Sequence, residues 1–103
     1  MSVLMQFAMF PSDTAESKSE QVSKIIEMIR DKGIPYKLNA MSTIVETETM
    51  NEALEILNSA YEVLEKNHSR VYSTVTFDIR KNKKNRMDGK VESIESKIGS
   101  VNK

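Results

Sequence analysis

The chain has 103 residues, enough for one compact domain with a core of limited size. Basic and acidic residues number 15 each, so net charge gives no argument for binding nucleic acid or an acidic surface. The chain has no cysteine and one histidine, which excludes disulfides, thiolate chemistry and a zinc site built from these residues. This composition fits a cytoplasmic protein, and we expect neither a signal peptide nor a membrane span of about 20 apolar residues.

The first part of the chain predicts a strand followed by a helix. Residues 3–10 form an almost uninterrupted apolar run that ends at Pro11, typical of a strand covered on both faces. Ser17 and Glu20 match a capping box, so we expect a helix from about residue 17. Gly33 and Pro35 should end it. Its predicted apolar side follows helical spacing and consists of Val22, Ile25, Ile26 and Ile29.

The middle of the chain predicts a hairpin, a second helix and a last strand. Residues 36–41 and 43–48 should form antiparallel strands joined by a very short turn. Thr49 and Glu52 match a second capping box. Residues 70–80 alternate as a strand does. The predicted apolar stripe of the second helix consists of Met50, Ala53, Leu54, Leu57, Tyr61 and Leu64.

This order, β-α-β-β-α-β, predicts an α+β, ferredoxin-like fold in residues 1–80. Two right-handed crossovers give a four-stranded antiparallel sheet with both helices on one face. Residues 81–86 should form a basic linker. Residues 87–99 should form a C-terminal helix with Asp88 as its N-cap and Gly99 at its end.

The C-terminal helix has a narrow apolar seam, and it should pack either on its own domain or on another subunit. The seam consists of Met87, Val91, Ile94 and Ile98. In the predicted fold the second face of the sheet has no helix from the first 80 residues. The first strand is apolar on both sides, which predicts oligomerisation or a ligand cleft at that face. The alternative is that the C-terminal helix covers it within one chain.

The basic linker also raises the question of RNA binding, because Tyr72 and Phe77 lie near it in the chain. An RNA-binding sheet of this fold needs stacking aromatic residues on both central strands. Residues 43–48 contain none. We therefore interpret residues 81–86 as a solvated linker and expect no nucleic-acid partner.

The hairpin holds the candidate binding residues. Ser42 and Glu46 should share one face of the strand, with Thr43 at the turn. A carboxylate beside hydroxyls suits an aminopyrimidine or a small cation, because burying a carboxylate requires a partner. The alternative is a solvated acid on an edge strand. The chain shows no nucleophile paired with a base and no phosphate-binding loop, so we expect no enzyme.

Five segments of the chain together carry a resemblance to a known family. They are, in chain order, Ala8-Met9-Phe10-Pro11, Leu38 to Glu46, Arg70-Val71, Asp78-Ile79-Arg80 and Lys90 to Ile94. In this order they resemble the small thiamine-binding proteins, a family long catalogued as uncharacterised. The resemblance covers nearly the whole chain, and its most specific parts are the T-x-x-E of the hairpin and the D-x-R that ends the last strand.

The resemblance implies a ferredoxin-like subunit that forms a homodimer, and further a homotetramer through its sheets, without catalysis and without a cofactor. It implies binding of thiamine or its hydroxymethylpyrimidine half, in support of uptake or salvage. Thr43 and Glu46 match the hairpin motif, with Ser42 as a polar neighbour, and Glu46 would accept hydrogen bonds from the aminopyrimidine. Thr47 stands where many members have glycine, and its side chain would narrow the approach to a ligand. By analogy of fold, the first strand would line the pocket with Gln6, Phe7 and Met9.

The alternative to a thiamine-binding protein is a regulatory or structural module. Ferredoxin-like modules of the ACT type bind amino acids at subunit interfaces. The chain is then a regulatory or structural oligomer that binds another metabolite, or none.

Overall fold

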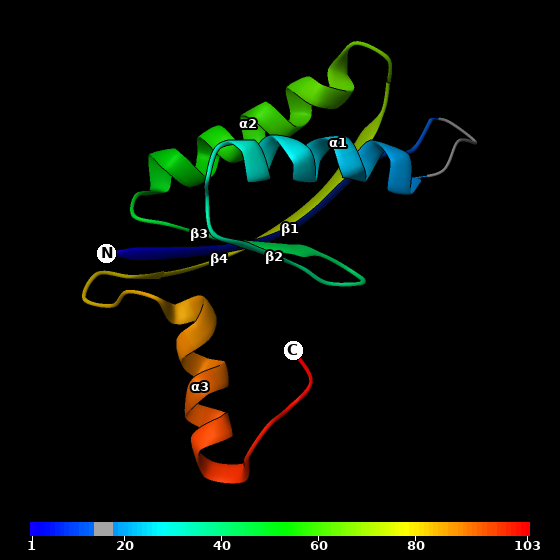
Figure 1. Cartoon of the computed structure of the whole chain (residues 1–103). Coiled ribbons are helices and arrows are strands. Elements are labelled where there is room, and N and C mark those ends of the chain that lie inside the picture. Colours follow the sequence, from blue (N-terminus) through cyan, green and yellow to red (C-terminus); the bar gives the residue numbers. More distant parts are fainter. Residues whose placement is uncertain (14–17) are drawn as a thin grey trace.

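A four-stranded antiparallel sheet organises the molecule, and the computed structural model describes residues 1–13 and 18–103 of it (Figure 1). The strands lie in the order β2-β3-β1-β4. The elements, in chain order, are β1 (Ser2–Pro11), α1 (Lys18–Asp31), β2 (Tyr36–Leu38), β3 (Thr43–Thr47), α2 (Met50–Glu65), β4 (Val71–Arg80) and α3 (Arg86–Ile98).

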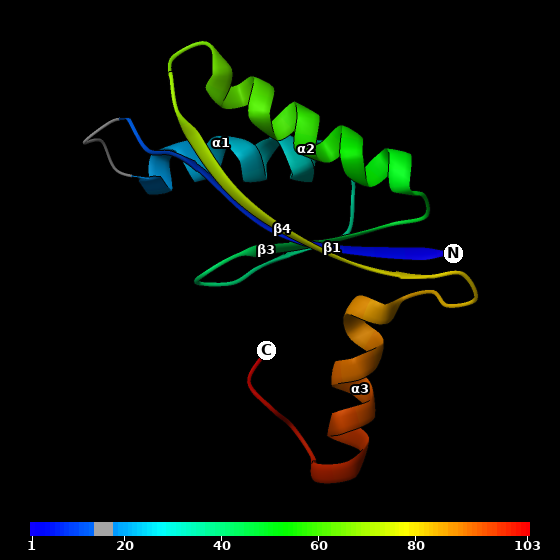
Figure 2. The same ribbon diagram turned by 180° about the vertical axis from the view of Figure 1, so that it is seen from behind.

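Helices α1 and α2 lie side by side over one face of the sheet, and α3 lies beyond the other face (Figures 1 and 2). This arrangement confirms the predicted α+β, ferredoxin-like class. The strand order also follows from it, because each βαβ crossover leaves room for one antiparallel strand between the two strands it joins.

Strand β1 supplies the centre of the core because alternate side chains point to the helix-covered face. Val3 and Met5 are completely buried, and Phe7 and Met9 are nearly so. On the opposite face, Leu4, Ala8 and Phe10 are partly buried and Gln6 is exposed, whereas Ser2 is buried. The core also contains Ile25, Ile29, Val45, Ala53, Ile56, Ala60 and Leu64.

Both covering helices bury narrower faces than the sequence predicts. In α1, Ile25 and Ile29 are buried, but the third buried residue is Gln21, which the apolar pattern missed. In α2 the buried residues are Ala53, Ile56, Ala60 and Leu64. The prediction that Leu54 and Tyr61 belong to this stripe is wrong, since they are 46% and 43% exposed. The small side chains of the two alanines let α2 pack closely on the sheet, so its outer apolar residues stay in solvent.

The ends of α1 and α2 agree with the predicted capping and stop signals wherever the structure describes the residues concerned. The Thr49 hydroxyl accepts a hydrogen bond from the Glu52 amide at 3.1 Å, which confirms the second capping box. Gly33 has a positive φ of 72°, suited to the turn that follows α1. The predicted cap at Ser17 lies outside the described residues.

The hairpin strands are shorter than the predicted ranges 36–41 and 43–48. Residues 39–42 form the turn, in which the Asn39 amide donates to the carbonyl of Ser42 at 2.8 Å. The turn is therefore wider than expected, and its side chains lie at the end of the sheet beside α1.

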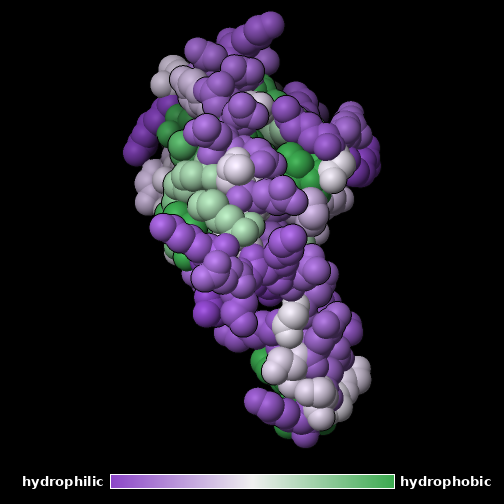
Figure 3. Space-filling model, turned by 90° about the vertical axis from the view of Figure 1, so that its left-hand side faces the viewer, coloured by the Kyte–Doolittle hydropathy of each residue, from purple (hydrophilic) through white to green (hydrophobic). Residues whose placement is uncertain are grey.

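Helix α3 begins one residue earlier than predicted and stands apart from the rest as a narrow lobe (Figure 3). The prediction of Asp88 as N-cap is wrong, because Asn85 holds that position. Asp88 lies in the first turn and pairs instead with Lys37 of β2, at 2.6 Å. Gly99 ends the helix as predicted. None of the helices in the described part of the chain is both long enough and apolar enough for a membrane span.

Candidate functional site

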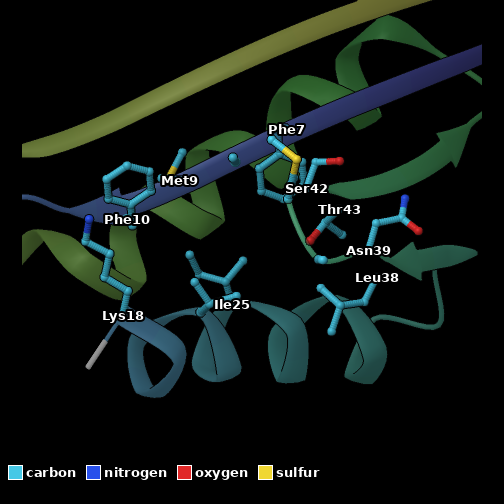
Figure 4. Close-up of a pocket in the computed structure, with 13 residues that line it drawn as sticks. Phe7, Met9, Phe10, Lys18, Ile25, Leu38, Asn39, Ser42 and Thr43 are labelled. Atoms are coloured by element: carbon cyan, nitrogen blue, oxygen red, sulfur yellow. The ribbon is translucent and has the colours of Figure 1, made fainter.

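A cavity of about 250 Å³ opens between β1, α1 and the hairpin turn, on the helix-covered side of the sheet (Figure 4). We call it the hairpin cavity. Its described lining residues are Phe7, Ala8, Met9, Phe10, Lys18, Val22, Ile25, Leu38, Asn39, Ala40, Met41, Ser42 and Thr43.

The two ends of the hairpin cavity differ in chemistry. Ser42, Thr43 and Asn39 lie together at one end, and Phe10 with Lys18 lies at the other (Figure 4). The Lys18 ammonium sits 4.2 Å from the centroid of the Phe10 ring, within the range of a cation–π contact. Apolar side chains of β1 and α1 form the walls between these ends. Such a site can hold a flat ring between its walls and hydrogen-bond the ring at one end.

Gln6 supports this site from outside the cavity. Its side chain lies on the opposite face of the sheet from Phe7 and is exposed. Its amide nitrogen donates to the Ser42 hydroxyl at 2.9 Å. The bond fixes the orientation of Ser42 at the rim.

Glu46 lies away from the hairpin cavity and holds α3. Its carboxylate accepts hydrogen bonds from the Ser2 hydroxyl at 2.6 Å and from the amides of Arg86 and Met87 at 3.0 and 3.1 Å. Those two amides belong to the first turn of α3, where helix N–H groups lack partners within the helix. Asn85 makes no side-chain cap, so Glu46 takes over this role from a different strand.

Arg86 closes the same network. Its guanidinium donates to the Ser2 hydroxyl at 3.1 Å, to the Ser2 carbonyl at 2.9 Å and to the Asp78 carbonyl, and it pairs with the Asp78 carboxylate at 3.0 Å. We call Ser2, Glu46, Asp78, Arg86 and Met87 the α3 anchor. It joins β1, β3, β4 and α3 at one point on the open face of the sheet.

Partial burial raises the pKa of Glu46, but the hydrogen bonds from Ser2, Arg86 and Met87, with the Arg86 charge, outweigh it, and the pKa is lowered overall. Glu46 is therefore a carboxylate at neutral pH, and its oxygens are occupied by groups of the chain itself.

A second cavity, of about 410 Å³, lies beside the α3 anchor. Glu46 and Thr47 line it, together with Glu48, Glu52 and Asp88. The Thr47 side chain is buried toward the helices, and its hydroxyl donates to the Thr49 carbonyl at 2.8 Å. Thr47, which stands where many members of the family have glycine, therefore borders this second cavity and not the hairpin cavity.

The structure brings together four of the six predicted binding residues. Phe7, Met9, Ser42 and Thr43 line the hairpin cavity, Gln6 reaches it only through Ser42, and Glu46 lines the second cavity. Phe10, Lys18 and Asn39 also line the hairpin cavity, although they were not among the predicted residues. Phe10 and Asn39 lie within the segments that resemble the family, so that resemblance could have indicated them.

A separate polar cluster joins two loops at the far end of β1 and β4. Asp13 accepts hydrogen bonds from the amide and hydroxyl of Ser69, and a ring nitrogen of His68 lies 3.1 Å from its carboxylate. The Ser69 amide is the main cause that lowers the pKa of Asp13 to about 2. Within residues 1–13 and 18–103, no group of three acidic or histidine side chains is placed to hold a metal ion.

The fold and the hairpin cavity define a small ferredoxin-like protein with a cavity of about 250 Å³ beside its hairpin turn. The chain belongs to the thiamine-binding protein family, whose model matches residues 5–95. UPF0045 proteins of Mycobacterium bovis and Mycobacterium tuberculosis are each 32% identical to it over 95 residues, which are 92% of this chain and 93% of the relative.

Solved structures of similar proteins share the fold. A hypothetical protein of Methanocaldococcus jannaschii is 28% identical, with a TM-score of 0.78 over 90% of this chain and 95% of its own. A Thermotoga maritima protein, described provisionally as a thiamine biosynthesis or salvage protein, is 19% identical, with a TM-score of 0.77 over 91% of this chain and 99% of its own. At that identity, the second likeness concerns the fold alone.

Proposed function

We propose that this protein binds thiamine or its hydroxymethylpyrimidine half in the hairpin cavity, without catalysis, and serves thiamine uptake or salvage in the cytoplasm. The observation that carries the proposal is the cavity itself. Its apolar walls end at the hydroxyls of Ser42 and Thr43, which lie in the hairpin of a chain that belongs to the thiamine-binding family.

The chemistry of the hairpin cavity suits an aminopyrimidine. Phe7, Met9 and Ile25 offer apolar surface to the faces of the ring. The hydroxyls and the Asn39 amide both donate and accept hydrogen bonds, so they match an exocyclic amine and a ring nitrogen without a carboxylate. A volume of about 250 Å³ lies just below the usual range of drug-sized sites, about 300–1,000 Å³. The cavity therefore favours the single pyrimidine ring over the two rings of thiamine.

Calorimetric titration of hydroxymethylpyrimidine and of thiamine tests this proposal. We expect both to bind, the pyrimidine at least as tightly as thiamine. Thr43→Val keeps the shape of the side chain and removes its hydroxyl, so affinity should fall about 5- to 10-fold, the usual value of one neutral hydrogen bond. Glu46→Gln is the control and should bind normally. No heat from either ligand at millimolar concentration, or reproducible turnover of a thiamine precursor, would contradict the proposal.

We also propose that the chain assembles with copies of itself through α3 and the open face of the sheet. Ile94 and Ile98 of the predicted seam are 39% and 73% exposed in the single chain. A 13-residue helix with such a seam gains little stability alone. Packing against another copy would bury these side chains.

A further inference from the structure

Strand β1 loses its neighbour β3 part of the way along its length. It pairs with β4 over all of its ten residues, but its ladder with the five-residue β3 ends where Phe7 lies opposite Thr43. Met9 lies further along β1 than Phe7, past the start of β3 (Figure 4). Three residues of β1 beyond this last pair, Ala8, Met9 and Phe10, line the hairpin cavity. One side of this part of β1 therefore borders a cavity rather than a strand.

The hydrogen bonds of the sheet show which backbone groups of β1 face this cavity. The Ser12 amide donates at 2.9 Å to the carbonyl of Arg70, its opposite residue when the β1–β4 register is continued. Bonded pairs alternate in an antiparallel ladder, so the even-numbered residues of β1 bond to β4. The Glu46 amide donates at 3.3 Å to the Pro35 carbonyl, so the even-numbered residues of β3 bond toward β2 and the odd-numbered ones toward β1. Both observations place the N–H and C=O of Met9 on the β3 side, toward the hairpin cavity.

The N–H and C=O of Met9 have no backbone partner within the described residues. The continued register would place Met41 opposite Met9, but the turn departs from β1 there and no backbone hydrogen bond joins the two. Met9 is only 8% exposed, and buried backbone groups are almost always hydrogen-bonded. Pro11, the next residue of β1 that faces this side, has no N–H to offer. Met9 therefore presents a donor and an acceptor side by side to the hairpin cavity.

We infer that the backbone of Met9 binds the edge of a heteroaromatic ring that carries an amino group beside a ring nitrogen. The ring nitrogen accepts a hydrogen bond from the Met9 N–H, and the amino group donates one to the Met9 carbonyl. The inference rests on the proposed function and deepens it, because the aminopyrimidine of thiamine and of hydroxymethylpyrimidine has such an edge. The second N–H of the amino group and the second ring nitrogen stay available to the hydroxyls of Ser42 and Thr43.

The space beside Met9 suits a ring rather than a further strand. The hairpin turn and α1 both border the cavity, through Asn39 and Ile25 respectively (Figure 4). A strand paired with β1 at Met9 would run into this turn, since the ladder with β3 begins only two residues away at Phe7. The cavity volume of about 250 Å³ leaves room for one ring between these walls. In this arrangement the ligand takes the place of the missing strand.

Amide hydrogen exchange, followed by NMR on the unaltered chain, tests the contact directly. In the free protein the Met9 amide should exchange faster than those of Ala8 and Phe10, which bond to β4. Saturating hydroxymethylpyrimidine should slow exchange at Met9 about 5- to 10-fold more than at these two neighbours, as expected for one new hydrogen bond. A Met9 amide as protected as that of Ala8 in the free protein would overturn the inference. Binding without a change at Met9 would overturn it and leave the proposed function standing, whereas absence of binding would overturn both.

Proline at position 9 gives a second measurement, because it removes the N–H without breaking a bond of the sheet. Strands accept proline where the N–H lies outside the ladder, and Pro11 already occupies such a position two residues further on. Met9→Ala is the matched control, since it also loses the buried side chain but keeps the N–H. Met9→Pro should bind hydroxymethylpyrimidine about 5- to 10-fold more weakly than Met9→Ala in calorimetric titration, the usual value of one neutral hydrogen bond. Equal affinity of the two folded variants would overturn the inference, and if Met9→Pro does not fold, the exchange measurement on the unaltered chain decides.

Discussion

The sequence indicates that Glu46 needs hydrogen-bond donors, but it does not indicate which residues supply them. A carboxylate in a strand of β-branched residues must find donors, and it finds them in Ser2 and in two amides of α3. These donors lie about 40 residues away in either direction along the chain. Strand alternation predicts on which face of the sheet Glu46 lies. It does not predict that α3 contacts Glu46 on that face.

Replacing Glu46 with glutamine separates its two possible roles. Glutamine has one acceptor oxygen in place of two, and its NH₂ group would face a helix amide that also donates. We expect the free energy of unfolding to fall by about 1–3 kcal/mol, the cost of a buried donor left unpaired. Hydrogen exchange should speed up at the Arg86 and Met87 amides, while pyrimidine affinity should not change. Weaker ligand binding with unchanged exchange would instead place Glu46 in the binding site.

Asp13 should make the free energy of unfolding depend on pH in the acidic range. Its pKa in the folded chain is about 2, below the ordinary value of 3.8. Such a group contributes its full stability to the folded state above its ordinary pKa, and this stability is lost as the pH falls from 3.8 through about 2. Asp13→Asn should therefore be less stable than wild type at pH 7, and in urea titrations the difference should shrink below pH 3.8 and vanish only below the folded pKa of about 2. Asp31→Asn, an exposed acid at the end of α1, serves as control and should show a smaller difference at pH 7.

At the scale of elements, local patterns predict most of the fold. Capping at Thr49, the stop at Gly33 and the alternation in β4 depend on residues close in sequence, so they can be read without the structure. The hairpin cavity could be predicted in part for the same reason, since Ser42 and Thr43 are adjacent in the sequence. Long-range contacts could not. Ser2 and Arg86 lie 84 residues apart, and no periodicity relates them.

Helix α3 shows how a long-range contact can fix the residue at which a helix begins. Its N-cap, Asn85, has a positive φ of 52° and makes no side-chain cap, which alone would leave the first turn weak. The α3 anchor replaces that cap and fixes the start of the helix on the sheet. The rest of α3 projects away from the sheet (Figure 1), which leaves Ile94 and Ile98 of its seam exposed.

At the scale of the whole molecule, α3 offers the surface for self-association that we propose. It lies beyond the open face of the sheet, and Ile94 and Ile98 are 39% and 73% exposed there. A symmetric contact between two copies would bury these side chains on both subunits.

Charge on this seam should separate the subunits. Ile94→Lys with Ile98→Lys places two charges on the exposed seam of α3 and should lower the mass of the assembly, because two like-charged surfaces would then face each other. Leu54→Lys, at a comparably exposed apolar residue of α2, is the matched control and should leave the mass unchanged. Sedimentation at several concentrations measures the mass, with far-UV circular dichroism to confirm folding. An unchanged mass in the double variant would show that copies of the chain do not meet through α3.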